Sequence, residues 1–327
     1  MKQCAHPAPY DDAVLTGNDT RFDREEIINA LPAVDDSTPL AAQLAEDLRR
    51  KISLGGTRYP KPARPRVITV SNQKGGVGKT TSAVNLAAAL ATGGLRVLVV
   101  DNDPQGNAST ALGIEHHAGT PSVYDAIINE LPLSQVIQPC ETVPGLDCAP
   151  ATIDLSGAEI ELVSVVAREN RLRSAITSLL AERADDPYDY VIIDCPPSLG
   201  LLTINAFVAA DEVLIPIQCE YYALEGLSQL LKNVELIRGH LNPRLHVSTI
   251  LLTMYDKRTN LSRQVADEVR QYFPNQTLET TIPRLVRISE APSYGQTIIT
   301  YDPTSTGALA YRMAAREMAD RAEHHNG

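Results

Sequence analysis

The feature that most constrains the fold is a glycine-rich stretch, Ser71 to Thr81, which reads Ser-Asn-Gln-Lys-Gly-Gly-Val-Gly-Lys-Thr-Thr. The apolar run Val67 to Val70 precedes it and predicts a strand. The segment Ser82 to Leu90, which follows, has the composition and period of a helix. A strand, a glycine loop and a helix in this order form the arrangement that a phosphate-binding loop requires.

The residue types in this loop suit a nucleotide and its metal. Gly75, Gly76 and Gly78 lack a Cβ, so the backbone can turn successive N–H groups inward onto phosphate oxygens. The helix that starts near Lys79 adds unpaired N–H groups and the positive end of its dipole. Lys79 can supply charge to the β and γ phosphates, and the Thr80 hydroxyl can bind Mg²⁺. An ordinary strand-to-helix turn is the alternative, and Gly-Lys-Thr after a β-branched strand argues against it.

One departure from the ordinary loop points to a family. The usual pattern has Gly at the position of Gln73, and a second lysine, Lys74, follows it here. The octapeptide Lys-Gly-Gly-Val-Gly-Lys-Thr-Thr resembles the deviant Walker A motif of the ParA/MinD group of ATPases. This resemblance implies that Val77 and Thr81 contact ATP with the rest of the motif, and that Lys74 and Lys79 serve catalysis. It also implies that Lys74 reaches the nucleotide of a second subunit, so that ATP holds a homodimer together.

Length, composition and charge limit the possible domain organisation and function. The 327 residues could form two average domains or one large one, and 43% hydrophobic residues suffice for a sizeable core. The sequence has no run of eighteen apolar residues and no secretory signal pattern at its start, which predicts a cytoplasmic protein. The five cysteines form no CxxC pair, which indicates buried or free thiols. A net charge of −11 means that nucleic-acid binding would need a local basic patch.

The charge and the proline content of the chain change before residue 64. Residues 1–48 carry three Lys/Arg and ten Asp/Glu, whereas residues 49–66 carry seven Lys/Arg and no acid. The proline-rich segment 59–65 cannot sustain a helix. We therefore predict a mobile N-terminal extension with a proline-rich basic linker over residues 1–63, and a ParA-type P-loop ATPase domain over residues 64–327. The basic stretch is either a contact for DNA or an anionic membrane, or a solvated linker.

The extension holds one candidate helix. Leu40, Leu44, Leu48 and Ile52 are spaced by four, behind a capping segment that starts at Asp36. Such a helix would dock on the domain or on a partner, or would form only transiently.

A second motif follows the apolar strand predicted over Arg96 to Asp101. The residues after it, Asn-Asp-Pro-Gln-Gly-Asn, place Asp103 where α/β folds hold ligand chemistry. The segment resembles the second motif of the ParA family, which implies that Asp103 positions or activates the attacking water. The alternative is that Asp103 caps the next helix.

A third motif lies at Tyr188 to Ser198. Its apolar residues lead to Asp194 at a strand end, which fits a Walker B element that holds Mg²⁺ together with Thr80. The alternative is a core strand that ends in an incidental aspartate. Cys195 beside it is predicted to be a small buried side chain.

The other predicted elements complete the fold class. Strands are expected at Leu146–Pro150, Glu212–Gln218, His246–Thr253 and Leu278–Ile282, and helices near Pro121–Ala126, Leu162–Leu180, Ala223–Leu241 and 305–323. Strands that alternate with helices predict an α/β fold of the P-loop NTPase type, a mostly parallel twisted sheet flanked by helices.

Two late loops resemble ParA-family segments, and the whole resemblance spans about residues 66–320. Arg258 and Arg287 match DNA contacts of the chromosomal members, and Pro283 matches an adenine-side position. The family's Asn after the Pro-Arg pair is Leu285 here, which leaves base recognition open.

The resemblance implies a partitioning ATPase. Its ATP-bound dimer would bind double-stranded DNA without sequence preference, in association with the nucleoid, and a ParB-like partner would stimulate hydrolysis and release. The sequence leaves open whether the cargo is a chromosome or a plasmid. A MinD-like membrane-cycling regulator is the main alternative, but Tyr311 to Ala322 is alanine-rich and of mixed charge, unlike that family's membrane anchor. An iron–sulfur reductase would need bridging cysteines, and a small-molecule kinase would give no reason for Lys74.

Overall fold

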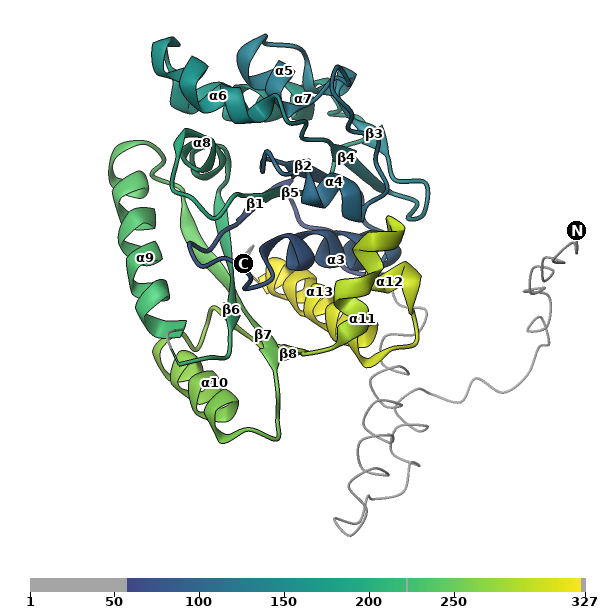
Figure 1. Cartoon of the computed structure of the whole chain (residues 1–327), viewed down its shortest axis with the longest axis vertical. Coiled ribbons are helices and arrows are strands. Elements are labelled where there is room, and N and C mark those ends of the chain that lie inside the picture. The colour runs from purple at the N-terminus through teal and green to yellow at the C-terminus, as the bar shows by residue number, and fades with distance from the viewer. Residues whose placement is uncertain (1–57, 222, 325–327) are drawn as a thin grey trace, which may run out of the picture. The chain divides into compact units, whose positions relative to one another are not determined.

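The computed structural model describes residues 58–221 and 223–324 (Figure 1). The helix expected over Leu40 to Ile52 lies outside the described residues. The described part forms an α/β fold around a single sheet, as the sequence predicts.

The sheet has eight strands in the order β3-β4-β2-β5-β1-β6-β7-β8. All neighbouring strands are parallel except β3 and β4, so seven strands end at the same edge of the sheet. The strands are β1 (Arg66–Val70), β2 (Val97–Asp101), β3 (Gln138–Pro139), β4 (Leu146–Ala149), β5 (Tyr190–Asp194), β6 (Glu212–Gln218), β7 (His246–Tyr255) and β8 (Thr277–Pro283).

Helices cover both faces of the sheet (Figure 1). One layer contains α3 (Lys79–Thr92) and α13 (Thr306–His324), which pack on each other and on the strands. The other layer contains α7 (Arg171–Glu182), α8 (Leu201–Ala209) and α9 (Ala223–His240). The shorter helices and α10 complete the fold: α4 (Asn107–Ala111), α5 (Val123–Ile128), η1 (Leu133–Gln135), α6 (Leu155–Glu161), η2 (Leu162–Ser164), η3 (Arg168–Asn170), α10 (Asn260–Tyr272), α11 (Val286–Glu290), η4 (Ala291–Tyr294) and α12 (Ile298–Tyr301). No helix in these described ranges is long and apolar enough to cross a membrane.

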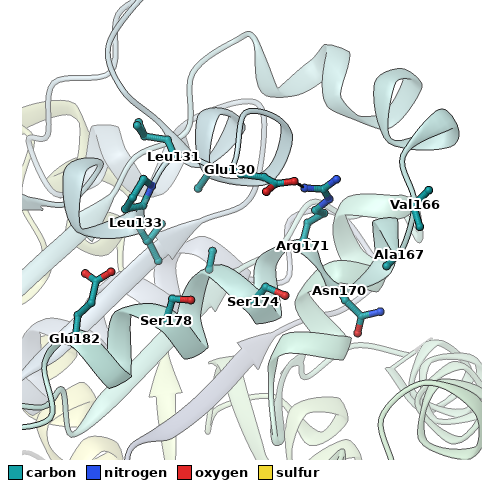
Figure 2. Close-up of a pocket in the computed structure, with 13 residues that line it drawn as sticks. Glu130, Leu131, Leu133, Val166, Ala167, Asn170, Arg171, Ser174, Ser178 and Glu182 are labelled. Atoms are coloured by element: carbon teal, nitrogen blue, oxygen red, sulfur yellow. Dashed lines mark hydrogen bonds and ion pairs between the residues drawn. The ribbon is translucent and has the colours of Figure 1, made fainter.

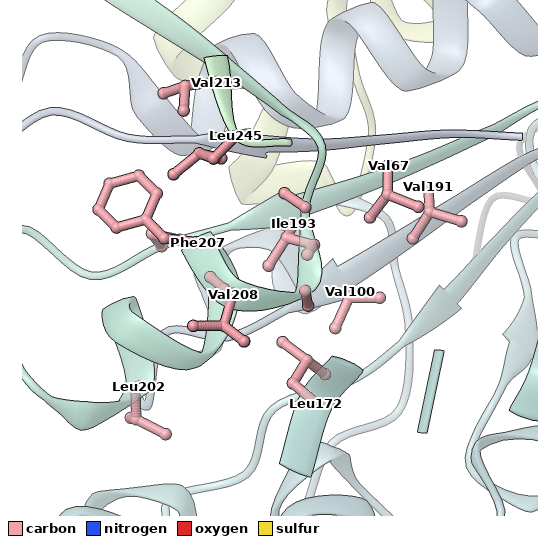
Figure 3. Close-up of a cluster of buried hydrophobic side chains, with 14 of the residues drawn as sticks. Val67, Val100, Leu172, Val191, Ile193, Leu202, Phe207, Val208, Val213 and Leu245 are labelled. Carbon is pink, nitrogen blue, oxygen red and sulfur yellow. The ribbon is translucent and has the colours of Figure 1, made fainter. Parts of the chain in front are cut away.

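The central strands are buried on both faces, which explains their continuous apolar sequences. Every residue of β2 and β5 is buried. Figure 3 shows Val100 and Ile193 from the sheet beside Phe207 and Val208 of α8. On the other face, the alanines of α3 are fully buried, so this helix can lie close to the sheet. The packing therefore holds the start of α3 in a defined place behind the glycine loop.

Some elements differ from the sequence prediction. The helix expected over Leu162–Leu180 is divided into the two 3₁₀ turns η2 and η3 and the helix α7. Ala167 has a φ of 52°, which a continuous right-handed helix cannot contain. The helices α8 and α10 and the two-residue strand β3 were not predicted. β3 is too short and α10 too polar to give a clear apolar pattern, whereas α8 is a nine-residue apolar run that periodicity alone cannot assign to a helix or a strand.

The chain enters the domain through Tyr59, which the sequence assigned to the mobile linker. Its ring is 7% exposed, its N–H donates to the Gly93 carbonyl at 2.9 Å, and its hydroxyl donates to the Arg312 carbonyl at 2.9 Å. Burial raises the pKa of this phenol to about 12. Lys61 lies 3.6 Å from the Asp189 carboxylate. Both residues thus contact the domain predicted to start at residue 64, and the function of the extension before them stays open.

We expect Gly93→Ala to destabilise the domain by about 1 to 3 kcal/mol through this contact. A Cβ on Gly93 would lie 2.3 Å from Cδ2 of Tyr59, whereas the φ of −75° is acceptable for alanine. Urea unfolding of the parent, both single variants and the double variant with Tyr59→Ala measures the coupling. In the Tyr59→Ala background the Gly93 substitution should cost nothing, and an equal cost in both backgrounds would contradict this packing.

Candidate nucleotide site

The three motifs meet because their strands are neighbours. The strands β2, β5 and β1 are adjacent and parallel, so Asp101, Asp194 and the glycine loop lie at the same edge of the sheet. Asp194 pairs in register with Asp101 on one side and with Val70 on the other. The strand order changes direction here, which is where open α/β sheets bind ligands.

The glycine loop is held open by contacts from distant strands. Gly76 and Gly78 have φ values of 75° and 90°, and a Cβ on Gly76 would meet no atom within 4 Å. Asn72 accepts from the Lys74 N–H at 3.0 Å and donates to the Pro216 carbonyl at 2.9 Å. The Thr253 hydroxyl of β7 donates to the Val77 carbonyl at 2.9 Å. The glycines therefore serve backbone conformation and access of a ligand rather than core packing.

Lys79 carries a buried charge with little compensation. The residue is 8% exposed, and among the described residues its Nζ donates only to the Lys74 carbonyl, at 3.4 Å. Burial lowers the pKa of this ammonium, while the charges of Asp194 and Asp103 oppose that effect. An ammonium in this state is suited to an anionic ligand such as a phosphate.

Asp194 fits a divalent cation. Neither of its buried oxygens has a hydrogen-bond partner of normal geometry among the described residues. Burial raises the pKa of this carboxyl well above its usual range and Asp101 adds to the effect, whereas Thr80 is near enough to lower it. A carboxylate that is buried and unpaired in this way is stabilised by a metal ion, and oxygen ligands from Asp and Thr suit Mg²⁺.

Asp101 was missed as a site residue at the sequence level. It is fully buried, and its Oδ2 accepts from the Ser109 hydroxyl at 2.7 Å and the Ser109 N–H at 2.8 Å. Its Oδ1 accepts from the Asp103 N–H at 3.3 Å. Burial raises the pKa of Asp101 to about 6. The residue therefore shapes the loop that carries Asp103, and only the neighbouring Asp-x-Asp spacing could have signalled it.

Asp103 is 7% exposed and accepts from the Gln105 N–H at 3.0 Å. The next helix, α4, begins at Asn107 with Gly106 as its N-cap and no side-chain cap, so the alternative that Asp103 caps this helix is wrong. A cavity of about 360 Å³ lies beside Asp103, with Glu159 and Ser198 among its lining residues. There is therefore room next to this carboxylate for a small reactant.

Lys74 lies apart from the buried charges of Lys79, Asp103 and Asp194. Its Nζ donates to Oε2 of Glu220 at 3.2 Å, and both side chains are about half exposed. The two lysines of the loop thus differ in direction, since Lys79 is buried in the site and Lys74 lies at the surface.

The two candidate arginines lie on neighbouring loops at the same edge of the sheet. Tyr255 at the end of β7 pairs with Pro283 at the end of β8, and the loops with Arg258 and Arg287 follow these residues. Arg258 forms an ion pair with Asp256, and Arg287 forms one with Asp302. Met254, just before Tyr255, has a φ of 50°, which is strained for a residue with a side chain.

A second cavity, of about 490 Å³, lies between α7 and the segment after α5 (Figure 2). Figure 2 shows Ser174 and Ser178 of α7 on one wall, Leu133 on the other, and the ion pair between Arg171 and Glu130 at one side. None of the three motifs lines this cavity, so it is separate from the nucleotide site.

The fold and the site together define a P-loop protein of the ATP-hydrolysing class. A family model described as an AAA domain matches residues 65–247. The chromosome partitioning protein ParA of Myxococcus xanthus is 54% identical over 256 residues, 78% of this chain and 88% of that protein. The sporulation initiation inhibitor protein Soj of Bacillus subtilis is 56% identical over 254 residues, 78% of this chain and 98% of that protein.

A solved structure agrees with these relatives. Cobyrinic acid a,c-diamide synthase from Mycobacterium smegmatis, with bound ATP analog and magnesium, superposes with a TM-score of 0.66 and 37% identity. The match covers 80% of this chain and 96% of that one. The chain belongs to the ParA/Soj family of partitioning ATPases, and it is an ATPase.

Ser109→Ala should destabilise the domain by about 1 to 3 kcal/mol, because it removes a donor to Asp101 and leaves the Ala151 N–H without its acceptor. In the parent, the Ser109 hydroxyl stabilises the ionised form of Asp101, whose pKa is about 6. The loss of stability should therefore be larger well above pH 6 than below it. Urea unfolding at one pH well above 6 and one below 6 measures the free energy of unfolding. Ser178→Ala, at an exposed serine, is the control. A loss that does not depend on pH would argue against a charged Asp101 in this network.

Proposed function

We propose that this ATPase segregates DNA as an ATP-bound homodimer that binds double-stranded DNA without sequence preference in association with the nucleoid. A ParB-like partner stimulates hydrolysis, which separates the subunits and releases the DNA. The observation that carries the proposal is the surface position of Lys74, whose ammonium pairs with the half-exposed Glu220 rather than with groups of its own site. From this position the ammonium can exchange Glu220 for a nucleotide held by a second copy.

The residues of the loop divide the work of binding ATP. The backbone of Gly75, Gly76, Val77, Gly78 and Thr81 surrounds the phosphates, and Lys79 neutralises them. Thr80 and Asp194 hold Mg²⁺, which stabilises charge on the β and γ phosphates when it is bound. Pro283 borders the adenine, although Leu285 in place of the family's Asn leaves that contact without an amide.

Support against a MinD-like membrane cycle comes from the packing of α13. Tyr311, Ala314, Ala315, Met318 and Ala319 are all buried, and the helix packs on α3 and β8. A helix with its apolar side in the core has no such side to offer to a membrane.

ATP turnover with and without duplex DNA and a ParB-like partner tests the function. Stimulation that requires both would support partitioning. Stimulation by anionic liposomes instead of DNA would favour the MinD-like alternative.

Asp103→Ala should retain ATP affinity and lose at least about 99% of ATP turnover. A carboxylate that positions or activates the attacking water contributes about 10²-fold or more to the rate. With the γ phosphate intact, the dimer should persist on DNA. Light scattering with ATP and phosphate release measure the two effects, and Asp154→Ala, at an exposed position of the same edge, is the control. A monomeric variant that hydrolyses ATP at the parent rate would refute the role.

Replacing Arg258 and Arg287 with Glu should weaken DNA binding while leaving ATP-dependent dimerisation intact. Loss of two phosphate contacts should reduce the slope of log affinity against log salt by up to about 1.8. Fluorescence anisotropy with a labelled duplex at several salt concentrations measures this. Arg238→Glu, at an exposed arginine of α9 paired with Glu235, is the net-charge control for each single replacement, Arg258→Glu or Arg287→Glu. Equal DNA affinity in the double variant and the parent would remove the DNA role of these loops.

A further inference from the structure

The guanidinium of Arg258 binds a carboxylate of its own loop. Its Nε donates to Oδ1 of Asp256 at 2.9 Å, and its Nη2 donates to Oδ2 at 2.9 Å. The Arg258 N–H also donates to Oδ1, at 3.0 Å. Two parallel bonds from one edge of a guanidinium form the same fork that binds a phosphate.

The surroundings of Asp256 are basic. Arg258, with a smaller contribution from Arg284 on the neighbouring loop, lowers the pKa of this carboxyl to about 2. Arg284 is exposed and was not selected at the sequence level. The side chain of Asp256 is 28% exposed and that of Arg258 is 85% exposed, so the pair lies within reach of a large ligand. The carboxylate of Asp256 thus interacts with Arg258 of its own loop and is within electrostatic range of Arg284 on the neighbouring loop.

We propose that Asp256 occupies the phosphate-binding edge of Arg258 in the DNA-free chain, so that DNA binding at this position exchanges a carboxylate for a phosphate. The inference rests on the proposed DNA role of Arg258 and adds a residue that limits affinity. Because an exposed ion pair contributes little, the exchange is nearly balanced. Asp256 therefore weakens DNA binding and makes release easy.

The second arginine provides a contrast within the same chain. Arg287 uses only Nη1 to bind Asp302, and the Asp302 side chain is 15% exposed. The fork edge formed by Nε and Nη2 has no bond to Asp302. Asp302 therefore holds Arg287 in place without covering the edge that a phosphate would use, and it is not a competitor of the kind that Asp256 is.

The test compares duplex binding by ATP-loaded full-length protein. Asp256→Asn should raise DNA affinity roughly two- to fivefold at low salt, the range of an exposed ion pair. Its salt slope should become steeper by up to about 0.9, because the phosphate contact no longer frees a carboxylate. Asp256→Ala should behave alike, which excludes an effect of the new amide. Glu235→Gln, which releases the exposed Arg238 of α9, controls for the same change in net charge.

The double variants decide the mechanism. In the Arg258→Ala background, Asp256→Asn should gain no more than Glu235→Gln does, and Asp302→Asn in the parent should likewise gain no more than Glu235→Gln. Weaker binding by Asp256→Asn would show that Asp256 orients Arg258, and a gain equal to that of Glu235→Gln would show only a net-charge effect. Either result overturns the exchange.

The same data separate this inference from the proposed function. If Arg258→Ala weakens binding and Asp256→Asn does not strengthen it, the exchange fails and the DNA role stands. If Arg258→Ala binds DNA like the parent, the DNA role of this loop fails and the exchange fails with it. An unchanged thermal midpoint in Asp256→Asn confirms that the fold is intact.

Discussion

The nucleotide site depends on charges that the folded chain buries without full compensation. Lys79 lies near the carboxylates of Asp103 and Asp194, and Asp101 adds a third buried carboxylate at the same edge of the sheet. Burial lowers the pKa of the ammonium and raises those of Asp101 and Asp194. The cost of this arrangement is offset when a phosphate and a metal ion supply the missing partners. The apolar strands stabilise an apo site whose charges are complementary to its ligand.

Sequence periodicity predicted the centre of the fold because buried parallel strands leave a strong signal. The strands β1, β2 and β5 are continuous apolar runs, and each precedes a motif, so their shared edge could be inferred. The break at Ala167 could not be predicted, because its positive φ occurs at a residue type that usually favours helices. The anchoring bonds of Asn72 and Thr253 join residues more than a hundred positions apart, and no local pattern encodes them.

Charge partners were harder to predict than charges. Resemblance selected Lys74, Arg258 and Arg287, and the structure shows that each is paired with a carboxylate of the same chain. Only Asp256 is close in sequence to its partner, whereas Glu220 and Asp302 reach theirs through the fold. These three basic side chains, in a chain with a net charge of −11, are therefore each neutralised by a neighbouring carboxylate.

The end of β7 connects the glycine loop with the loop that carries Arg258. Thr253 holds the glycine loop through Val77, and Asp256 binds Arg258, so only Met254 and Tyr255 separate the two attachments. The strained Met254 lies between them. A backbone rotation that relaxes this residue would change the direction of the chain on either side of it. The backbone conformation at Met254 therefore sets the direction in which the chain leaves the glycine loop's anchor at Thr253 for the loop that carries Arg258.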